Sequence, residues 1–584
     1  MDLDAKRKAL MEMLLAEEGF DADSSVESSG AIKPRDVASP CPLSFAQQRL
    51  WFIDQLDPGN PAYNVPGVLD IHGKLNAAEL PIAMSRVVER HESLRTRFVD
   101  RPDGPMQEVL PPSEATRAFT FTQSDLSHIL GYDRESELKH LVHSELNHRF
   151  DLANGPLFRL HLIHLEDSHA RLLFTLHHII CDGHSLGLIA EELSKAYTIE
   201  TTDPLKIQLD DYCVWQRSDE AKQAQTNHLK YWTDKLAGIE LCELPADRPR
   251  PAAPTHHGAK AEFSISEALR QRVEAFARAQ NTTPFIVLMA AFKAFVYRHT
   301  GLKDLSIGTP VAGRTRAETE SLIGFLTNTL VIRSQLELRM SFWAFLDQLK
   351  QTTNEAWEHQ DVPFEQVVEA LSPERSLDRN PLFEILFVFQ PKFEASALGD
   401  AYMSLLLPEV SSVKFDYTFN LRETDTSYAG WVEYNADIFD SITIEDGCGR
   451  FVRLLEGAIE RPDTPIAELP LMDAAEWNHT VHTLNTTHQV FDETRWVHDW
   501  FSYQAQRTPA APAIRFEGSS WTYQKLESAA NRLAHYFIAH GAGPDVAIGI
   551  CMERSPQLIV GMMAILKAGS AYLPLDPAYP QDRL

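Results

Sequence analysis

The chain has 584 residues, more than one hydrophobic core usually organises, so three or four folding units are expected. Apolar residues account for 44% and charged residues for 23%, as in ordinary soluble globular proteins. The formal net charge of −28, without a long basic cluster, argues against nucleic acid and anionic membrane as main partners.

The first forty residues predict a helix followed by a linker. Residues 1–20 place Leu3, Leu10 and Leu14 on one apolar stripe, and residues 21–41 are rich in Ser, Asp and Pro. A helix separated from the main domain by a linker has no core of its own to bury against. We therefore expect a docking element for another chain, with packing back onto the domain as the alternative.

Residues 42–244 predict a first α/β lobe. Ser44 caps an amphipathic helix that reaches Phe52, and helices and strands alternate along the rest of the lobe. Strands are expected at 63–71 and 157–165 and from 172 onward, and helices at 76–91, 135–149, 186–197 and 212–232.

Residues 245–258 form a proline-rich connector, and residues 259–464 predict a second α/β lobe. Four prolines between Pro245 and Pro254 favour a stiff, extended chain. The second lobe is expected to contain helices at 266–279 and 283–299 and one ending near 359, a polar turn at 312–315, and strands at 305–311, 385–389, 415–421 and 431–434.

Residues 465–490 predict a second linker, and residues 491–584 predict the beginning of a further α/β domain. Its elements are a helix from Thr522, a strand at 546–552, a helix ending at Lys567 and a strand from 571.

The most informative stretch is Leu172–Gly183, an apolar run that ends in two histidines, an aspartate and a glycine. Side chains of a strand alternate between faces, so we expect His178 on the face of Leu172 and Phe174, and His177 on the opposite face. Polar groups at the end of a buried strand are costly unless they form hydrogen bonds or serve a function. Because a neutral imidazole can exchange a proton near neutral pH, His178 is the candidate for chemistry, with a satisfied structural histidine as the alternative.

The predicted localisation is cytoplasmic. No apolar run reaches the roughly 18 residues of a membrane span, and Glu12, Glu17 and Glu18 interrupt any signal-peptide core. Six cysteines are scattered through the chain, which is typical of reduced thiols rather than of a disulfide framework.

Several short motifs together resemble the condensation domains of nonribosomal peptide synthetases. The central motif is His177–Gly183 (HHIICDG), which matches the pattern HHxxxDG. Others follow in the family's order: Ser44–Phe52 (SFAQQRLWF), Arg90–Phe98 (RHESLRTRF), Asp211–Trp215 (DYCVW), Ile307–Arg314 (IGTPVAGR) with Asn328 and Thr329, His359–Gln366 (HQDVPFEQ) and Arg379–Phe383 (RNPLF). Trp521–Leu526 and Leu566–Pro577 resemble the beginning of the adenylation domain that usually follows.

The resemblance implies both a fold class and a reaction. The implied fold is α/β, with two chloramphenicol-acetyltransferase-like lobes in a V-shaped arrangement, an active site in a tunnel between them, and an incomplete α/β adenylation subdomain. The implied reaction is amide formation, in which the amine of a downstream aminoacyl thioester attacks an upstream acyl thioester. Phosphopantetheine arms of carrier proteins hold both groups, the donor carrier acts in trans, and no bound cofactor is expected.

The resemblance also implies roles for the HHxxxDG residues. His178 orients the attacking amine or accepts its proton, and His177 braces the turn. Asp182 fixes the turn by pairing with an arginine, for which Arg314 is the candidate. Gly183 allows close backbone approach, and its amide can stabilise a developing oxyanion.

Four further residues are candidates for substrate binding. They are Arg95, Arg149, Asn328 at the tunnel floor, and His184, which stands where the family commonly has Trp. For the two arginines, a structural or solvated role is the alternative.

Other interpretations stay open at this point. A metal held by His177, His178 and His184 is disfavoured because the first two are expected on opposite strand faces. The motifs resemble the type that joins an L-configured donor to an L-configured acceptor. The alternatives are epimerising or heterocyclising relatives, a chain-initiating domain that takes a free acyl thioester, and a non-catalytic recruitment domain. Adenylation activity is not expected, because that family's phosphate loop and catalytic lysine would lie beyond Leu584.

Overall fold

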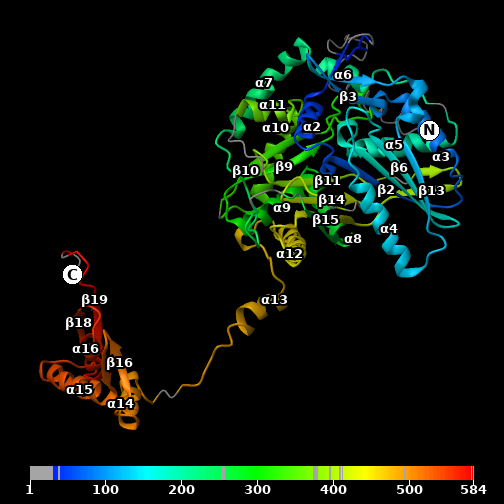
Figure 1. Cartoon of the computed structure of the whole chain (residues 1–584). Coiled ribbons are helices and arrows are strands. Elements are labelled where there is room, and N and C mark those ends of the chain that lie inside the picture. Colours follow the sequence, from blue (N-terminus) through cyan, green and yellow to red (C-terminus); the bar gives the residue numbers. More distant parts are fainter. Residues whose placement is uncertain are drawn as a thin grey trace. The chain divides into compact units, whose positions relative to one another are not determined.

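The computed structural model describes residues 31–36, 40–200, 202–251, 255, 257–337, 339–371, 379–393, 396–406, 410, 412–491, 494–580 and 582. The chain divides into two compact units, Met1–Ala474 and Ala475–Leu584 (Figure 1). The helix predicted for residues 1–20, and most of the linker predicted for 21–41, lie outside the described residues. Among the described helices, none is long and apolar enough to cross a membrane.

The N-terminal lobe of the first unit is built on a six-stranded sheet of order β12-β13-β2-β7-β6-β5. All neighbours pair antiparallel except β5 and β6, which are parallel. The strands are β2 (Asn64–His72), β5 (Thr120–Asp125), β6 (Phe158–Glu166), β7 (His169–His177), β12 (Ser396–Leu398) and β13 (Ala401–Leu405). A smaller sheet of order β1-β4-β3 joins Cys41–Pro42, Gly104–Val109 and Thr96–Arg101.

The helices of this lobe begin where the sequence supplies caps. Ser44 and Gln47 form a reciprocal capping box that starts α2, and Asp182 caps α5 through the Ser185 amide. The helices are α2 (Phe45–Leu56), α3 (Glu79–Arg90), α4 (Gly131–Leu146), α5 (Gly183–Tyr197), α6 (Leu209–Gln216) and α7 (Asp219–Leu236).

The single helix predicted for 212–232 is therefore wrong. Helix α6 ends at Gln216. The Ser218 side chain accepts a hydrogen bond from the Ala221 amide and so starts α7 as a separate helix. A serine side chain competes for backbone amides and so favours a helix start over a helix interior.

The C-terminal lobe is built on a second six-stranded sheet of order β10-β9-β11-β14-β15-β8. Its strands are β8 (Gly258–Ile265), β9 (Asp304–Val311), β10 (Asn328–Gln335), β11 (Ile385–Gln390), β14 (Tyr417–Glu423) and β15 (Tyr428–Asn435). Its helices are α8 (Glu267–Ala279), α9 (Pro284–Thr300), α10 (Phe342–Glu358), α11 (Phe364–Leu371) and α12 (Ser441–Glu460). Helix α9 is buried along most of its length because it is apolar on nearly every face, and it contacts both α10 and α12.

One segment of the C-terminal half crosses to the N-terminal sheet. Strand β13 pairs with β2, placing Tyr402 opposite His72 and Leu405 opposite Leu69. Leu398 and Met403 are buried in the N-terminal core. The two lobes are thus interlocked by this crossover as well as joined by the connector at 245–258.

The second unit is small and contains two two-stranded sheets, β16-β17 and β18-β19. Its elements are α14 (Val497–Arg507), β16 (Pro512–Phe516), β17 (Ser519–Thr522), α15 (Tyr523–Ala539), β18 (Ala547–Cys551), α16 (Pro556–Lys567) and β19 (Ala571–Leu575), and α13 (Ala474–Asn478) begins at the boundary.

Candidate active site

The histidine pair lies where β7 turns into α5. Strand β7 ends at His177, a 3-10 turn covers His178–Ile180, and α5 begins at Gly183. The expectation that His178 continues the alternation of the strand is wrong, because the extended backbone stops one residue earlier. The two rings still differ, but the turn separates them rather than the two faces of a strand.

His177 closes the turn on itself. Its side chain is buried, and its Nδ1 accepts a hydrogen bond from the Ile179 amide at 3.2 Å. The neutral ring therefore carries its proton on Nε2. Burial lowers the pKa of His177 to about 3, and His178 and Lys414 add to that lowering. His177 is therefore neutral, and its side chain stabilises the turn.

His178 presents the opposite nitrogen. Its Nδ1 lies 2.8 Å from the Cys181 carbonyl oxygen. Because a carbonyl only accepts, Nδ1 donates its proton there, and Nε2 is left with a lone pair. The half-buried ring packs against Phe325 at 4.4 Å between centroids. Burial lowers the pKa of His178 to about 3, and the positive charge of Lys414 lowers it further.

Asp182 is the most heavily bonded side chain of the turn. It is fully buried and forms an ion pair with Arg314 at 2.9 Å. Its oxygens also accept bonds from the amide and hydroxyl of Ser185, from the Leu326 amide, and from the amide and hydroxyl of Thr327. Burial by itself would raise the pKa of Asp182, but Arg314 and Ser185 outweigh it and the pKa is lowered.

This carboxylate joins the two lobes at the candidate site. Asp182 belongs to the N-terminal lobe, whereas Arg314 follows β9 and Thr327 precedes β10 in the C-terminal lobe. The Ser185 hydroxyl adds a second link, because its oxygen accepts a hydrogen bond from the Gly324 amide at 3.0 Å. The turn that carries His178 is therefore fixed from both sides.

Gly183 and His184 are the exposed residues of the turn. A Cβ at Gly183 would meet no protein atom within 4 Å. The space beside this glycine is therefore open, and packing of the folded chain does not require a glycine here. Burial lowers the pKa of His184, and the nearby Arg314 does the same. These two residues are placed where an incoming molecule can approach the start of α5.

Arg95 and Arg149 lie in other surroundings. Arg95 is buried, donates to the Leu110 carbonyl and pairs with Glu92 at 3.7 Å. Arg149 is an exposed residue that donates to the Pro58 carbonyl at 3.0 Å. Within the described residues, no hydrogen bond or ion pair joins either arginine to the HHxxxDG turn.

The side-chain amide of Asn328 forms all its hydrogen bonds with backbone groups. Its Nδ2 donates to the carbonyls of Gln360 and Val362, and its Oδ1 accepts from the amides of Thr329 and Phe364. Four bonds saturate the amide group. Asn328 therefore braces the loop before α11 and has little left to offer a substrate.

Several residues of the site had no predicted role. Gln47, from the SFAQQRLWF motif, donates to the Ile179 carbonyl and so supports the turn. Ser185 and Thr327 bond Asp182, Phe325 packs on His178, and Lys414 acts on both histidines. The motif match was a signal for Gln47, but nothing in the local sequence pointed to Phe325 or Lys414.

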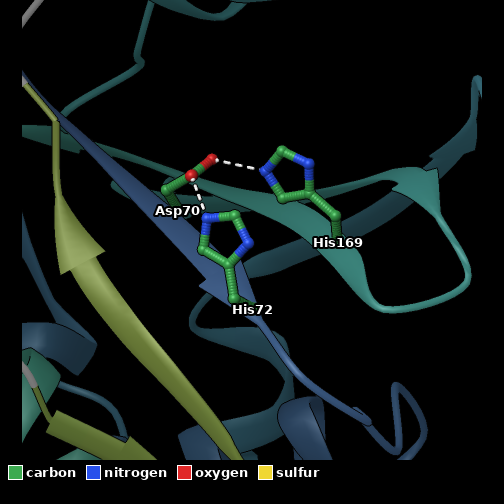
Figure 2. Close-up of side chains that lie close together, drawn as sticks. All are labelled: Asp70, His72 and His169. Atoms are coloured by element: carbon green, nitrogen blue, oxygen red, sulfur yellow. Dashed lines mark hydrogen bonds and ion pairs between the residues drawn. The ribbon is translucent and has the colours of Figure 1, made fainter.

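In the part of the chain that the structure describes, one cluster has the spacing of metal ligands, and it excludes the HHxxxDG residues. It consists of Asp70, His72 and His169 (Figure 2). Both imidazoles bond the Asp70 carboxylate, at 2.7 and 3.0 Å. Arg171 already supplies a positive charge to the same carboxylate at 3.1 Å, and the two rings stack at 4.3 Å with only 13° between their planes. Nearly parallel rings do not direct their in-plane lone pairs at one ion, so the fit to a metal is poor.

Comparison with known families gives two matches in chain order. The family described as Condensation domain matches residues 37–479, and the family described as AMP-binding enzyme matches residues 501–584.

Curated relatives are parts of large synthetases. The chain is 38% identical to a linear gramicidin synthase subunit of Brevibacillus parabrevis over 93% of its own length and 11% of that protein. It is 36% identical to phosphinothricin tripeptide synthetase PhsC of Streptomyces viridochromogenes over 100% of its length and 54% of that protein. The chain thus spans only part of the relatives it matches.

Solved structures share the fold. A four-domain nonribosomal peptide synthetase bound to AMP and glycine matches with a TM-score of 0.75 at 24% identity, covering 94% of this chain and 42% of that one. The first condensation domain of the calcium-dependent antibiotic synthetase, in complex with a substrate analogue, matches with a TM-score of 0.64 at 20% identity, covering 75% of this chain and 100% of that one.

Proposed function

The chain belongs to the condensation-domain family of nonribosomal peptide synthetases, and from this membership we propose that its first unit joins an upstream acyl or peptidyl thioester to a downstream aminoacyl thioester. Phosphopantetheine arms of two carrier proteins present the groups. The products are a longer acyl chain with a new amide bond on the downstream arm and a free thiol on the upstream arm.

The observation that carries the proposal is the tautomer of His178. The Cys181 carbonyl holds the proton on Nδ1, so Nε2 offers a lone pair from a rigid turn. An attacking amine must be neutral and must point its own lone pair at the thioester carbonyl. A hydrogen bond from the amine to Nε2 orients it in that way.

The pKa of about 3 favours orientation over general-base catalysis. A group with so low a pKa is a poor proton acceptor at neutral pH, but it stays neutral and ready to accept a hydrogen bond. In this proposal His178 is the catalytic residue that touches the amine. His177 and Asp182 are positioning residues that hold the turn, and the open side of Gly183 admits the thioester.

Arg95 and Asn328 are engaged by the fold and are not placed in the proposed substrate site, whereas the exposed Arg149 stays a candidate for substrate binding. His184 stays in it as an exposed residue on the acceptor side of the turn. The proposed domain bounds remain 42–244, 245–258 and 259–464 for the lobes and connector, followed by a linker at 465–490 and the adenylation-like part at 491–584.

The test is dipeptidyl formation from two loaded carriers, followed by mass spectrometry of the downstream carrier. His178→Ala should lower the rate by about 10²-fold or more, the range of one well-placed catalytic group. His178→Gln is the matched variant, since its amide oxygen accepts a hydrogen bond but does not act as a base. Partial rescue by Gln supports orientation.

Two outcomes contradict the proposal. If the wild-type chain forms no peptide with any carrier-bound donor but does so with a free acyl thioester, the chain-initiating alternative holds. If neither donor gives product and carriers still bind, the domain is a recruitment module. Unchanged rates in His178→Ala would remove this histidine from the chemistry.

A further inference from the structure

Lys414 is a cation that the proposed mechanism does not use. It lies just before β14 in the C-terminal lobe, and its Nζ is 5.1 Å from the centroid of the Tyr63 ring. Tyr63 directly precedes β2, whose first residue Asn64 pairs with His177 across the sheet. The lysine therefore reaches from one lobe to the strand end of the other, where the histidine pair lies.

Within the described part of the chain, this ammonium group has no ion-pair partner. Among the described residues, no carboxylate oxygen lies within 4 Å of its Nζ and no hydrogen bond engages it. Its contact with Tyr63 is to a ring face, which attracts a cation but does not neutralise it. The residue keeps solvent exposure, so a small molecule can reach it.

Glu433 is the nearby carboxylate whose charge acts on Lys414, and it is engaged elsewhere. Its Oε1 accepts from the Trp431 indole at 2.9 Å and from the Asn420 amide at 3.4 Å. Burial raises the pKa of Glu433. Arg49 adds a second positive charge on the same side, although it is itself paired with Glu365 at 3.4 Å.

We propose that Lys414 binds a carboxylate carried by one of the two acyl groups that meet at His178. An exposed ammonium group that pairs with no carboxylate of the described residues is available for a charge-assisted hydrogen bond to an arriving anion. The α-carboxyl group of each substrate is consumed in its thioester, so the carboxylate must come from an acidic side chain or from an acidic acyl group. This inference deepens the proposed function and rests on it for the identity of the ligands.

The substrate must therefore be acidic on either the donor or the acceptor side. A charge-assisted bond to a partly enclosed lysine favours a carboxylate over its amide analogue by about 10- to 100-fold in affinity. The protein lowers the pKa of Lys414 to about 8, and its ammonium form still predominates at pH 7. The selectivity should hence fade above pH 8 as the lysine loses its proton.

The experiment measures binding to the full chain, so that it does not depend on turnover. The probes are hydrolysis-resistant pantetheine amides of glutamate and glutamine, each made as an acceptor analogue with a free amine and as a donor analogue with an acylated amine. We expect glutamate to bind about 10- to 100-fold more tightly than glutamine in one of the two forms. Lys414→Gln should abolish this ratio, and Lys414→Arg should retain most of it.

Two matched variants sharpen the test. Arg49→Gln removes a neighbouring cation that is already paired, and the ratio should not change. Glu433→Gln removes the competing negative charge, and the ratio should rise. Thermal unfolding of each variant checks that the fold is intact.

Equal binding of glutamate and glutamine in both forms by the wild-type chain would overturn the inference. A loss of affinity in Lys414→Gln that is the same for both analogues would also overturn it, and would show that Lys414 contacts the pantetheine portion that the two analogues share. Neither result bears on the proposed function, which fails only if loaded carriers give no peptide.

Discussion

Strand β7 has a histidine-containing cluster at each of its two ends, and the clusters are built differently. At its start, His169 shares the Asp70 carboxylate with His72 and Arg171; the three partner side chains are 25% to 38% exposed, and that of Asp70 is 12% exposed. At its end, His177 leads into a turn fixed by Asp182 and Arg314, whose side chains are 0% and 3% exposed.

The difference shows how burial affects the contribution of an ion pair to stability. Water and salt screen the charges around Asp70, and its partners can be replaced by solvent. Asp182 is shielded from solvent, so removing one member of its ion pair leaves the other charge uncompensated. We therefore expect the loss of a single charge to cost more stability at the end of β7 than at its start.

The largest expected effect is at the buried end. Asp182→Ala leaves the buried Arg314 without its counter-charge and removes the cap of α5, so the free energy of unfolding should fall by about 3–5 kcal/mol. Peptide formation should be lost with it, because the turn that carries His178 is no longer fixed. Denaturant unfolding and the two-carrier assay measure the two effects.

The double variant Asp182→Ala with Arg314→Met serves as the control for this prediction. It removes both charges, and part of the lost stability should return. If Asp182→Ala costs no more than Asp70→Ala, the contrast between the two ends is wrong.

The second effect is a pH dependence from His177. Its pKa is about 3 in the folded protein and about 6.5 in the unfolded chain, so the unfolded state binds more protons between these values. The free energy of unfolding should therefore fall by about 1.4 kcal/mol for each pH unit as the pH drops from 6.5 toward 3. The measurement is denaturant unfolding at several pH values.

His177→Asn is the matched variant for the pH series. The asparagine oxygen can accept from the Ile179 amide but does not titrate, so the slope should be smaller by about that amount. A slope that is identical in both proteins would mean that His177 does not remain neutral in the fold.

The smallest effect is expected at the start of β7. Asp70→Asn keeps the shape but removes the charge shared by His72, His169 and Arg171, and it should cost about 1 kcal/mol or less. The cost should shrink further in 1 M salt, whereas the cost of Asp182→Asn should not. A salt-independent loss at Asp70 would show that this cluster behaves like a buried one.

The sequence predicted most of what depends on local chemistry. Ser266 and Thr283 cap α8 and α9 at the expected residues, because N-cap bonds are made within a few positions along the chain. The HHxxxDG motif located the strand-to-helix turn, and the family resemblance supplied the two-lobe fold. The sequence did not show that the extended backbone ends at His177, since a 3-10 turn and a strand end have similar residue patterns.

Other features depended on residues far apart in the chain. The crossover of β13 to β2 joins positions more than three hundred residues apart, and no local pattern encodes such a pairing. The saturated amide of Asn328 could likewise not be foreseen, because its four partners are backbone groups brought to it by folding.

The sequence by itself determined the elements, the caps and the residue types at the turn, because these follow from periodicity and from bonds between near neighbours. The tertiary structure decided which histidine offers a lone pair, how many donors surround Asp182, and that the charge of Lys414 acts on both histidines. Charge and protonation depend on burial and on partners from both lobes, and only the folded chain brings those together.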